Sequence, residues 1–284
     1  MGKTYLVTGA SGFLGSHIAD YLHSKKNYVR LFDKKKSKYK KKNQKMFLGN
    51  INNLKDLDKA TKKIHTVLHF AASADLTRSN EKPFETIEHN IIGTAKLLRL
   101  CVKNKVKKIV FASSIYARSE QGGIYSTSKL SSEMIIEKIC KKFGIKFVVL
   151  RFGTVYGDRA NSFNTVQNFI NSAKKKKNIF RQTRGNEIRS YINVKDVAKI
   201  TFMSLQKKYE NGFYNVFGNK NIIVRDLLNV IKGFSPDLKI FYSKVDKKKY
   251  NYKVNPFTYK LRLGKKLKLK KYIPINEGIK SLLK

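Results

Sequence analysis

Short apolar runs alternate with segments of helical periodicity through the first half of the chain. The runs are rich in β-branched and aromatic residues, as buried strands are, and they span residues 5–8, 28–32, 66–70, 109–113 and 147–151. Between them apolar residues recur every three or four positions, as at Leu14, Ile18, Tyr21 and Leu22. Strands that alternate with amphipathic helices predict a parallel sheet covered by helices on both faces.

The pattern becomes irregular after Arg151. A stretch rich in glycine, asparagine and lysine precedes one helical pattern near residues 194–205 and one strand pattern near 213–216. We therefore expect an α/β fold, a Rossmann-type doubly wound parallel sheet with a smaller, partly discontinuous C-terminal α/β lobe. The expected division of the chain is 1–152 plus about 192–217 for the sheet domain, and about 153–191 plus 218–284 for the lobe.

A glycine-rich turn joins the first predicted strand to the first predicted helix. Gly9, Gly12 and Gly15 follow one another at intervals of three residues. In such a turn the first glycine permits the tight bend, the second lets backbone N–H groups approach a pyrophosphate, and the third lets helix and strand pack closely. The N-terminus of the helix faces the anion, so we expect Phe13 and Leu14 to contact the same dinucleotide.

An acidic residue ends the second predicted strand. Asp33 closes the segment Arg30-Leu31-Phe32-Asp33, where a carboxylate can accept hydrogen bonds from the hydroxyls of an adenosine ribose. Its negative charge would repel a 2′-phosphate, which favours NAD as the cofactor. The lysines at 34–36 could accommodate that phosphate, so NADP stays an alternative.

A tyrosine and a lysine stand four residues apart at the start of a predicted helix. Tyr125 and Lys129 therefore share one face of that helix, and Ser113 and Ser114 end the strand before it. The ordinary pKa of a tyrosine is about 10, but the Lys129 charge and a nicotinamide cation would favour the phenolate. Tyr125 could then take a proton from a substrate hydroxyl that Ser114, or alternatively Ser113, orients.

With these motifs, the chain resembles the NAD-dependent epimerase/dehydratase family, the sugar-nucleotide branch of the extended short-chain dehydrogenases/reductases. The resemblance extends to Gly49-Asn50-Ile51, to His69-Phe70-Ala71-Ala72 and to the segment Asn90-Ile91-Ile92-Gly93-Thr94. Asn50 stands where relatives commonly have aspartate. The resemblance implies that Tyr125 and Lys129 contact the nicotinamide ribose, and that the NAD groove is also lined by Asn50, Ile51, Phe70, Ala71, Ala72, Asn90 and Phe152.

Two further segments resemble the part of the family that binds a nucleotide sugar. Thr154 lies in the segment 150–157, where relatives often have asparagine, and its hydroxyl could bond a sugar or a diphosphate. Arg189 begins a segment whose arginine pairs with the substrate diphosphate in relatives, and a guanidinium fork suits two phosphate oxygens. The resemblance therefore implies that Ser114, Thr154 and Arg189 bind substrate.

The reaction follows from the residues that accompany Ser114. Dehydratases of the family place an acidic pair after this serine, whereas this chain has Ile115 and Tyr116. Reductive epimerases need a cysteine and a histidine near the sugar, whereas Cys101 and Cys140 fall in helical patterns away from the motif loops. By elimination we expect 4-epimerisation of a UDP-hexose through a transient 4-keto sugar. An NAD(P)-dependent reductase or dehydrogenase and a 4,6-dehydratase stay alternatives.

The formal net charge of +42 by itself would suggest a nucleic-acid partner. The lysines, however, are spread in short runs along the whole chain, and no recognition motif accompanies them, so we expect no nucleic-acid partner. A scaffold that senses NAD(H) or binds nucleic acid without catalysis is the alternative from another class. The nucleotide-sugar substrate could itself be attracted by the positive field.

Three expectations concern the surroundings of the protein. No apolar run approaches the roughly 20 residues of a membrane span and no leader pattern opens the chain, which favours a cytoplasmic protein without membrane insertion. The two cysteines have no partners at metal-ligand spacing, so no metal site is expected. The resemblance implies a homodimer that pairs the helices at 87–102 and 128–143.

Overall fold

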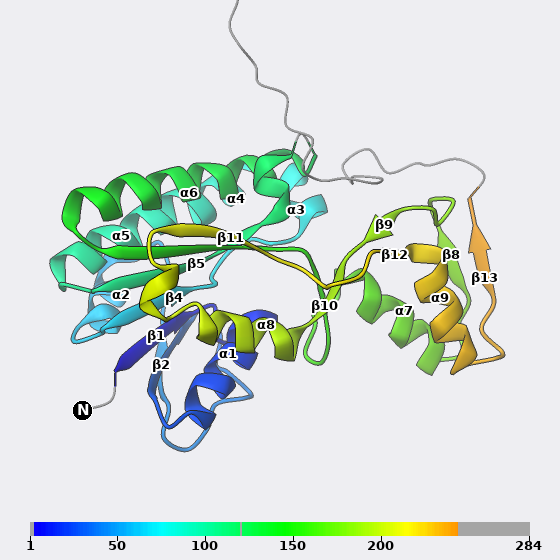
Figure 1. Cartoon of the computed structure of the whole chain (residues 1–284), viewed down its shortest axis with the longest axis horizontal. Helices are drawn as coiled ribbons and strands as arrows, with labels where there is room; N and C mark the ends of the chain where they lie inside the picture. Colours follow the sequence, from blue (N-terminus) through cyan, green and yellow to red (C-terminus); the bar gives the residue numbers. More distant parts are fainter. Residues whose placement is uncertain (1–2, 120, 244–284) are drawn as a thin grey trace, which may run out of the picture.

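The centre of the molecule is a seven-stranded parallel sheet (Figure 1). The computed structural model describes residues 3–119 and 121–243. The strand order is β11-β6-β5-β4-β1-β2-β3, so the chain winds outward from the middle in both directions. The strands are β1 (Thr4–Thr8), β2 (Tyr28–Asp33), β3 (Lys45–Leu48), β4 (Thr66–His69), β5 (Lys108–Ser114), β6 (Lys146–Phe152) and β11 (Gly212–Val216).

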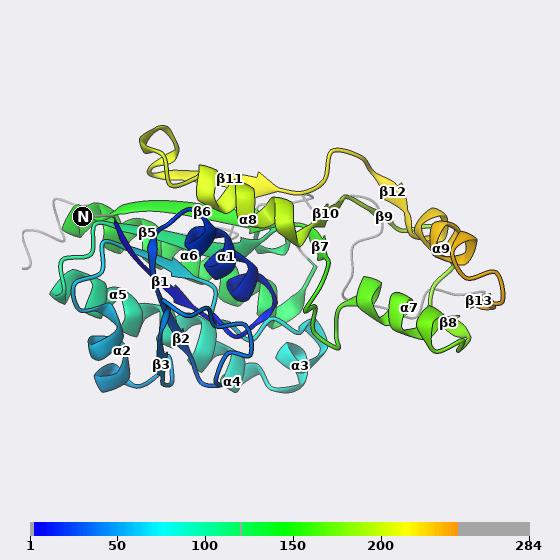
Figure 2. The ribbon, with the colours of Figure 1, turned by 90° about the horizontal axis from the view of Figure 1, so that it is seen from below.

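Helices cover both faces of this sheet (Figures 1 and 2). One face packs against α1 (Phe13–Ser24) and α8 (Val194–Met203), and the other against α2 (Leu54–Thr61), α5 (Gly93–Lys103) and α6 (Gly123–Phe143). Because side chains alternate along a strand, Tyr5 and Val7 enter the first core while Leu6 enters the second. Two apolar layers therefore hold the sheet rigidly between them.

A smaller group of elements lies beyond the carboxyl edge of the sheet (Figure 1). The chain enters this group after β6 and returns to the large sheet domain through residues 191–193 and α8. It enters the group a second time after β11. Its elements are β7 (Thr154–Tyr156), α7 (Thr165–Lys174), β8 (Ile179–Arg181), β9 (Ile188–Arg189), β10 (Tyr191–Asn193), β12 (Ile222–Ile223), α9 (Val224–Gly233) and β13 (Ile240–Tyr242). Its own small core contains Phe169, Ile179 and Leu228. The domain bounds expected from the sequence stay a prediction, and their last part, 244–284, lies outside the described residues.

Five short elements complete the described chain. They are α3 (Leu76–Glu81), α4 (Pro83–Ile87), the π-helical turn η1 (Glu88–Ile92), and the 3₁₀ turns η2 (Ile115–Arg118) and η3 (Lys207–Tyr209). The π-turn leads directly into α5, so the chain from 83 to 103 runs as one helical rod with a local widening.

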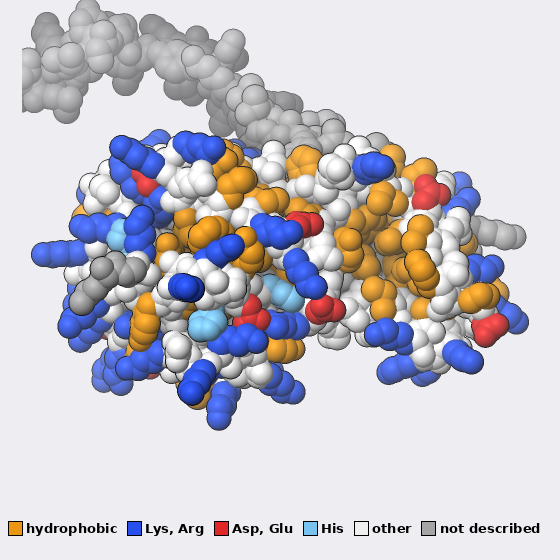
Figure 3. Space-filling model, turned by 60° about the horizontal axis from the view of Figure 1, so that its bottom comes forward, with side chains coloured by type: hydrophobic (Ala, Val, Ile, Leu, Met, Phe, Trp, Pro, Cys, Tyr) orange, Lys and Arg blue, Asp and Glu red, His pale blue; other side chains and the backbone are white. Residues whose placement is uncertain are grey.

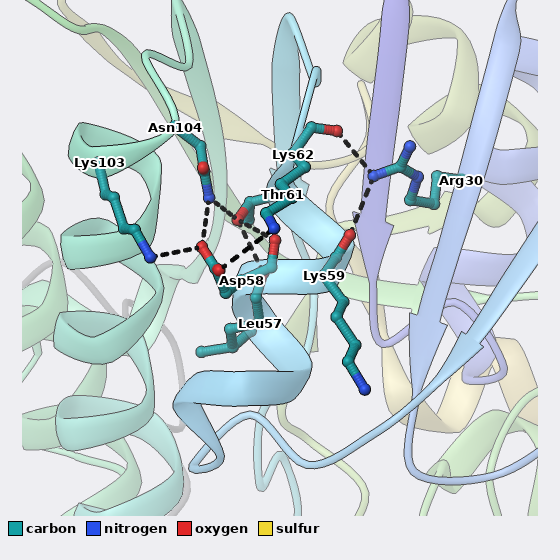
Figure 4. Close-up of polar contacts among 8 residues, drawn as sticks. All are labelled: Arg30, Leu57, Asp58, Lys59, Thr61, Lys62, Lys103 and Asn104. Carbon is teal, nitrogen blue, oxygen red and sulfur yellow. Dashed lines mark hydrogen bonds and ion pairs between the residues drawn. The ribbon is translucent and has the colours of Figure 1, made fainter.

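Polar contacts fix the C-terminal end of α2 between β2 and α5 (Figure 4). The Arg30 guanidinium donates to the backbone oxygens of Ala60 and Lys62 at 2.6 and 2.9 Å, and so occupies carbonyls that a helix leaves unpaired at its end. Across the helix, Asn104 donates to the Asp58 carboxylate at 3.0 Å, and Asn104 belongs to the end of α5. These contacts attach α2 to both neighbours.

The strands predicted at 5–8, 28–32, 66–70, 109–113 and 147–151 all exist, within one residue of the observed bounds at each end. The sequence analysis missed β3, a four-residue edge strand whose exposed ends, Lys45 and Leu48, interrupt the apolar pattern. The predicted helix near 194–205 and strand near 213–216 are α8 and β11. Among residues 3–119 and 121–243, no helix combines the length and apolarity that a membrane span requires.

Candidate active site

The loops that follow the central strands converge on one cavity of about 360 Å³ at the carboxyl edge of the sheet. Parallel strands all present their carboxyl ends at the same edge, and the order of this sheet reverses between β1 and β4. The cavity brings together most of the residues predicted for the site, namely Gly9, Gly12, Phe13, Leu14, Gly15, Asp33, Asn50, Ile51, Phe70, Ala71, Ala72, Ser114, Tyr125, Lys129 and Phe152.

The glycine loop has the backbone geometry that close approach of a dinucleotide requires. Gly9 has a φ of +68°, and a Cβ there would lie 2.7 Å from the backbone nitrogen of Ala71. A Cβ on Gly15 would overlap the carbonyl oxygen of Gly9. Helix α1 begins after Gly12, and no side chain caps its N-terminus. The first N–H groups of the helix are therefore left available to a bound phosphate. The loop therefore fits a pyrophosphate.

The carboxylate of Asp33 is held at the end of β2 by two backbone groups. Ser11 N donates to Asp33 Oδ2 and Lys35 N donates to Asp33 Oδ1, each at 3.0 Å. The Ser11 hydroxyl donates to the Lys35 carbonyl at 2.6 Å and closes this small ring. A fixed carboxylate suits the ribose hydroxyls of NAD and repels a 2′-phosphate. Lys34 also lines the cavity.

The two serines at the end of β5 have different partners. Ser114 and Tyr125 line the same cavity, and the Ser114 hydroxyl lies close enough to lower the pKa of the phenol. The Ser114 hydroxyl also accepts a hydrogen bond from the backbone N–H of Tyr116 at 3.2 Å. The Ser113 hydroxyl instead donates to Glu133 Oε1 at 2.5 Å. Ser114 therefore faces the phenol that could act as a base, whereas Ser113 belongs to a buried ionic network behind it.

Lys129 lies buried behind Tyr125. Its ammonium donates to the carbonyl oxygen of Ala112 at 2.8 Å and lies 5.9 Å from the centre of the Tyr125 ring. Burial lowers the pKa of Lys129 to about 8, although the Glu133 carboxylate opposes that change. The lysine therefore still carries its positive charge for most of the time at neutral pH.

The pKa of the Tyr125 phenol depends on its surroundings in the cavity. Burial raises the pKa of Tyr125 to about 12, and the nearby Ser114 hydroxyl only partly offsets this. In the absence of the cofactor, burial is thus the dominant influence on the phenol. The expected combined effect of Lys129 and a nicotinamide cation stays a prediction.

Glu133 and Arg151 form a buried ion pair beneath the serines. The guanidinium of Arg151, at the end of β6, donates to both carboxylate oxygens of Glu133, at 2.9 and 2.7 Å. The Glu133 side chain is 1% exposed. With Ser113 the pair ties α6 to β5 and β6, which holds the helix that supplies Tyr125 against the sheet.

Three predicted site residues lie outside the cavity lining. The Asn90 amide donates to the carbonyl of Ser73 and to the hydroxyl of Ser128, and its oxygen accepts from Ser73 N at 2.7 Å. Thr154 belongs to β7, and Arg189 in β9 donates to the carbonyl of Ile188. A cofactor role for Asn90 and substrate roles for Thr154 and Arg189 stay predictions.

Several lining residues were not among the predicted site residues, although Ser113 had been named as the alternative serine. They lie near the ends of the sheet strands, in the loops after them, in the π-turn η1, in β7 or in the loop between β7 and α7, and they are Phe32, Lys34, Gly49, Ala74, His89, Ala112, Ser113, Gly153, Val155, Asn161, Phe163 and Asn164. All but those at 161–164 lie next to or near predicted residues, and a wider window around each motif would have included them. The residues at 161–164 carry no motif, so only the tertiary structure shows them.

A family model described as the NAD dependent epimerase/dehydratase family matches residues 5–216, which contain the glycine loop, Asp33 and the catalytic helix. The chain belongs to this family. Membership confirms the resemblance drawn from the sequence and the expected dependence on NAD.

Relatives within the family catalyse more than one reaction. A Methanocaldococcus jannaschii protein with the provisional name UDP-glucose 4-epimerase is 29% identical, over 80% of this chain and 81% of that one. A dTDP-D-glucose 4,6-dehydratase of Dictyostelium discoideum is 27% identical over 74% of this chain, which spans only 57% of that protein. The crystal structure of a Thermotoga maritima UDP-glucose 4-epimerase with UDP-glucose has a TM-score of 0.83 and 25% identity, covering 90% of each chain.

In this family member, Gly15→Ala should disturb the cofactor loop. The added methyl group meets the backbone of Gly9, which cannot rotate away, so we expect the free energy of unfolding to fall by about 1–3 kcal/mol and NAD to bind more weakly. Gly233→Ala is the matched control, because its Cβ would meet nothing within 4 Å. Denaturant unfolding and NAD titration of both variants measure the effect. Equal behaviour of the two would contradict a close approach at Gly15.

Proposed function

We propose that the chain is an NAD-dependent nucleotide-sugar epimerase that interconverts UDP-hexoses at C4 through a transient 4-keto sugar. The observation that supports this best is that Ser114, Tyr125 and Lys129 line the same cavity as the glycine loop and Asp33. A sugar hydroxyl beside Ser114 and Tyr125 would lie close to both a base and the cofactor. The epimerases named above support the substrate class.

The chain's own residues supply the proton chemistry. The glycine loop and Asp33 would hold NAD, which would supply the acceptor and then the donor for the hydride at C4 of the sugar. Ser114 orients the 4-hydroxyl by a hydrogen bond, and Tyr125 removes its proton as the carbon is oxidised. Lys129, fixed by the Ala112 carbonyl, places a positive charge behind the ring and stabilises the phenolate while it exists. Tyr125 gives the proton back when the ketone, turned in the pocket, is reduced from its other face.

The residues next to Ser114 support epimerisation over dehydration. Ile115 is buried and begins the short turn η2, and Tyr116 follows it, so neither position offers the acidic group that removal of water at C5 and C6 requires. His89 lines the cavity and could in principle exchange a proton there. Its Nδ1 pairs with the Glu85 carbonyl at 2.9 Å, which fixes the ring within its own helical segment. Dehydration, reduction and oxidation of a nucleotide sugar stay the alternative activities.

Proton NMR of the full chain with UDP-glucose, UDP-galactose and their N-acetyl analogues, each with catalytic NAD, tests the proposal. New anomeric signals at unchanged mass are the expected result. A keto sugar that has lost water would establish a dehydratase, and a change that consumes one equivalent of NADH would establish a reductase. If neither epimerised nor otherwise altered sugar forms, the proposed activity is wrong for these substrates. The control is the same incubation without added NAD, using protein from which any bound NAD has been removed.

A homodimer and a cytoplasmic location belong to the same proposal. An apolar groove between α5 and α6 supports the dimer and is lined by Ala95, Leu98, Arg99, Val102, Ile135, Ile139 and Phe143. These are the two helices that the family resemblance predicts to pair. The lysine and arginine side chains, blue in Figure 3, are spread over the face shown, which supports their interpretation as solvated side chains.

The described part of the chain contains no group of three or more histidine, cysteine or acidic residues that could hold a metal ion. Cys101 and Cys140 are both buried in the second core, and burial raises the pKa of each thiol. A redox or acid–base role at the sugar is therefore not assigned to either cysteine. The proposed reaction requires only NAD and the hydroxyl, phenol and ammonium groups described above.

A further inference from the structure

A chain of buried polar groups crosses the molecule behind the cofactor cavity and has no part in the proposed proton transfers. Thr8 ends β1, His69 ends β4 and Thr94 lies in the first turn of α5; their exposed fractions are 0%, 1% and 1%. Thr8 Oγ1 lies 2.8 Å from His69 Nδ1, and His69 Nε2 lies 3.0 Å from Thr94 Oγ1. The imidazole thus bridges two hydroxyls that come from separate elements.

The neighbouring hydrogen bonds determine where the protons lie. The Thr94 hydroxyl donates its only hydrogen to the Asn90 carbonyl at 2.6 Å, so it accepts from His69 and places the ring proton on Nε2. His69 Nδ1 is then an acceptor, and the Thr8 hydroxyl donates to it. The oxygen of Thr8 in turn accepts from the backbone N–H groups of Phe70 and Ala71, both at 3.2 Å.

We infer that His69 is a positioning residue for the cofactor pocket, held as the neutral Nε2–H tautomer, which fixes the backbone of Phe70 and Ala71 against the glycine loop. The fixed segment matters because it touches Gly9 directly: a Cβ on Gly9 would lie 2.7 Å from the Phe70 carbonyl carbon and from Ala71 N. Both Phe70 and Ala71 line the cavity. Loss of the bridge would let this wall move relative to the pyrophosphate loop.

The Thr94 end of the bridge is connected to α6, the helix that contains Tyr125. The Asn90 carbonyl accepts from Thr94 and also from the Ser132 hydroxyl at 2.9 Å. The Asn90 side-chain amide donates to the Ser73 carbonyl and to the Ser128 hydroxyl. Ser128 precedes Lys129 in α6. The bridge therefore connects the segment after β4, the π-turn and the catalytic helix in one buried network.

An uncharged imidazole suits this bridge better than other side chains. A protonated ring would add an N–H that points at the Thr8 oxygen, which already accepts two hydrogen bonds. Burial, with a smaller contribution from the Lys129 ammonium, lowers the pKa of His69 to about 3. One donor and one acceptor on separate edges of a rigid ring let histidine satisfy both hydroxyls at once.

Nitrogen NMR of the full-length protein labelled at histidine tests the tautomer. We expect His69 to show one protonated and one unprotonated ring nitrogen, with the proton on Nε2 and no titration between about pH 5 and pH 8. A proton on Nδ1, or a His69 ring that becomes charged in this range, would overturn the inference. This measurement needs neither substrate nor turnover, so it stands apart from the proposed epimerase activity.

A matched pair of variants tests the effect on the pocket. Thr94→Val keeps the shape but removes the hydroxyl, and we expect it to bind NAD about tenfold more weakly, whereas Thr94→Ser should bind NAD nearly as the wild type does. The inference rests on the proposed function only in that this cavity binds NAD. Wild-type NAD affinity in a folded Thr94→Val variant would overturn it, even if sugars are epimerised. If Thr94→Val does not fold, Thr8→Val and Thr8→Ser apply the same comparison at the other end of the bridge.

Discussion

Replacing Tyr125 with phenylalanine should lower kcat for UDP-hexose epimerisation by roughly a hundredfold or more, with little change in the affinity for NAD. The phenol lines the cavity with Ser114 and is the proposed proton acceptor, so its removal leaves the 4-hydroxyl without one. The ring itself remains, so the packing around Lys129 is preserved. Initial rates by coupled assay and NAD titration of the same preparation give both quantities.

Tyr28→Phe is the matched control for this variant. Tyr28 begins β2 and is 44% exposed, far from any role in the proposed chemistry, so the same loss of a hydroxyl should leave kcat at the wild-type value. Wild-type turnover by Tyr125→Phe would mean that another group removes the proton and that the assignment of the base is wrong. An equal fall in kcat for both variants would instead indicate a general effect on folding.

Removal of Glu133 should destabilise the protein by about 3–5 kcal/mol. The carboxylate is buried, accepts two hydrogen bonds from Arg151 and one from Ser113, and its loss leaves a buried guanidinium without its counter-charge. Denaturant unfolding of Glu133→Ala measures the change in the free energy of unfolding. A variant too unstable to purify at ordinary temperature is compatible with this result and can be measured at lower temperature.

Two further variants test whether the loss of stability in Glu133→Ala comes from leaving a charge unpaired at a buried site. Glu137→Ala, four residues further along the same helix, removes a partner from the exposed Lys141 and should cost less than about 1 kcal/mol. The double variant Glu133→Met, Arg151→Met removes both charges and should recover most of the loss, because an apolar pair needs no counter-charge. Equal losses for Glu133→Ala and Glu137→Ala would show that burial of the pair has no special effect.

The strands of the central sheet were predictable because their signal is local. Fully buried parallel strands such as β4 and β5 appear as continuous apolar runs, and the helices between them repeat every three or four residues. The edge strand β3 was missed because it is short and half exposed, so its residues carry no clear period. The small strands β7 to β10 have two or three residues each, too few to form any pattern.

The residues of the site likewise fall into those that could be predicted from local sequence and those that could not. Gly9, Gly15 and Asp33 could be predicted because the turn and the strand end that they serve are formed by neighbours in the sequence. Tyr125 and Lys129 share a face simply because they are four residues apart in a helix. In each case the geometry needed for function follows from spacing alone.

The remaining features depended on which segments meet in space. Whether Ser113 or Ser114 faces the phenol is decided by the direction of each side chain at the end of β5, which the buried pair of Glu133 and Arg151 sets. The direction of the Tyr125 pKa shift follows from its burial, a property of the whole fold. The sequence by itself determined the sheet, the glycine loop and the shared helix face of Tyr125 and Lys129, because neighbouring residues form them. Only the tertiary structure decided the different surroundings of Ser113 and Ser114, the cavity wall at 161–164 and the His69 bridge, because their partners come together only when the parallel strands align their ends.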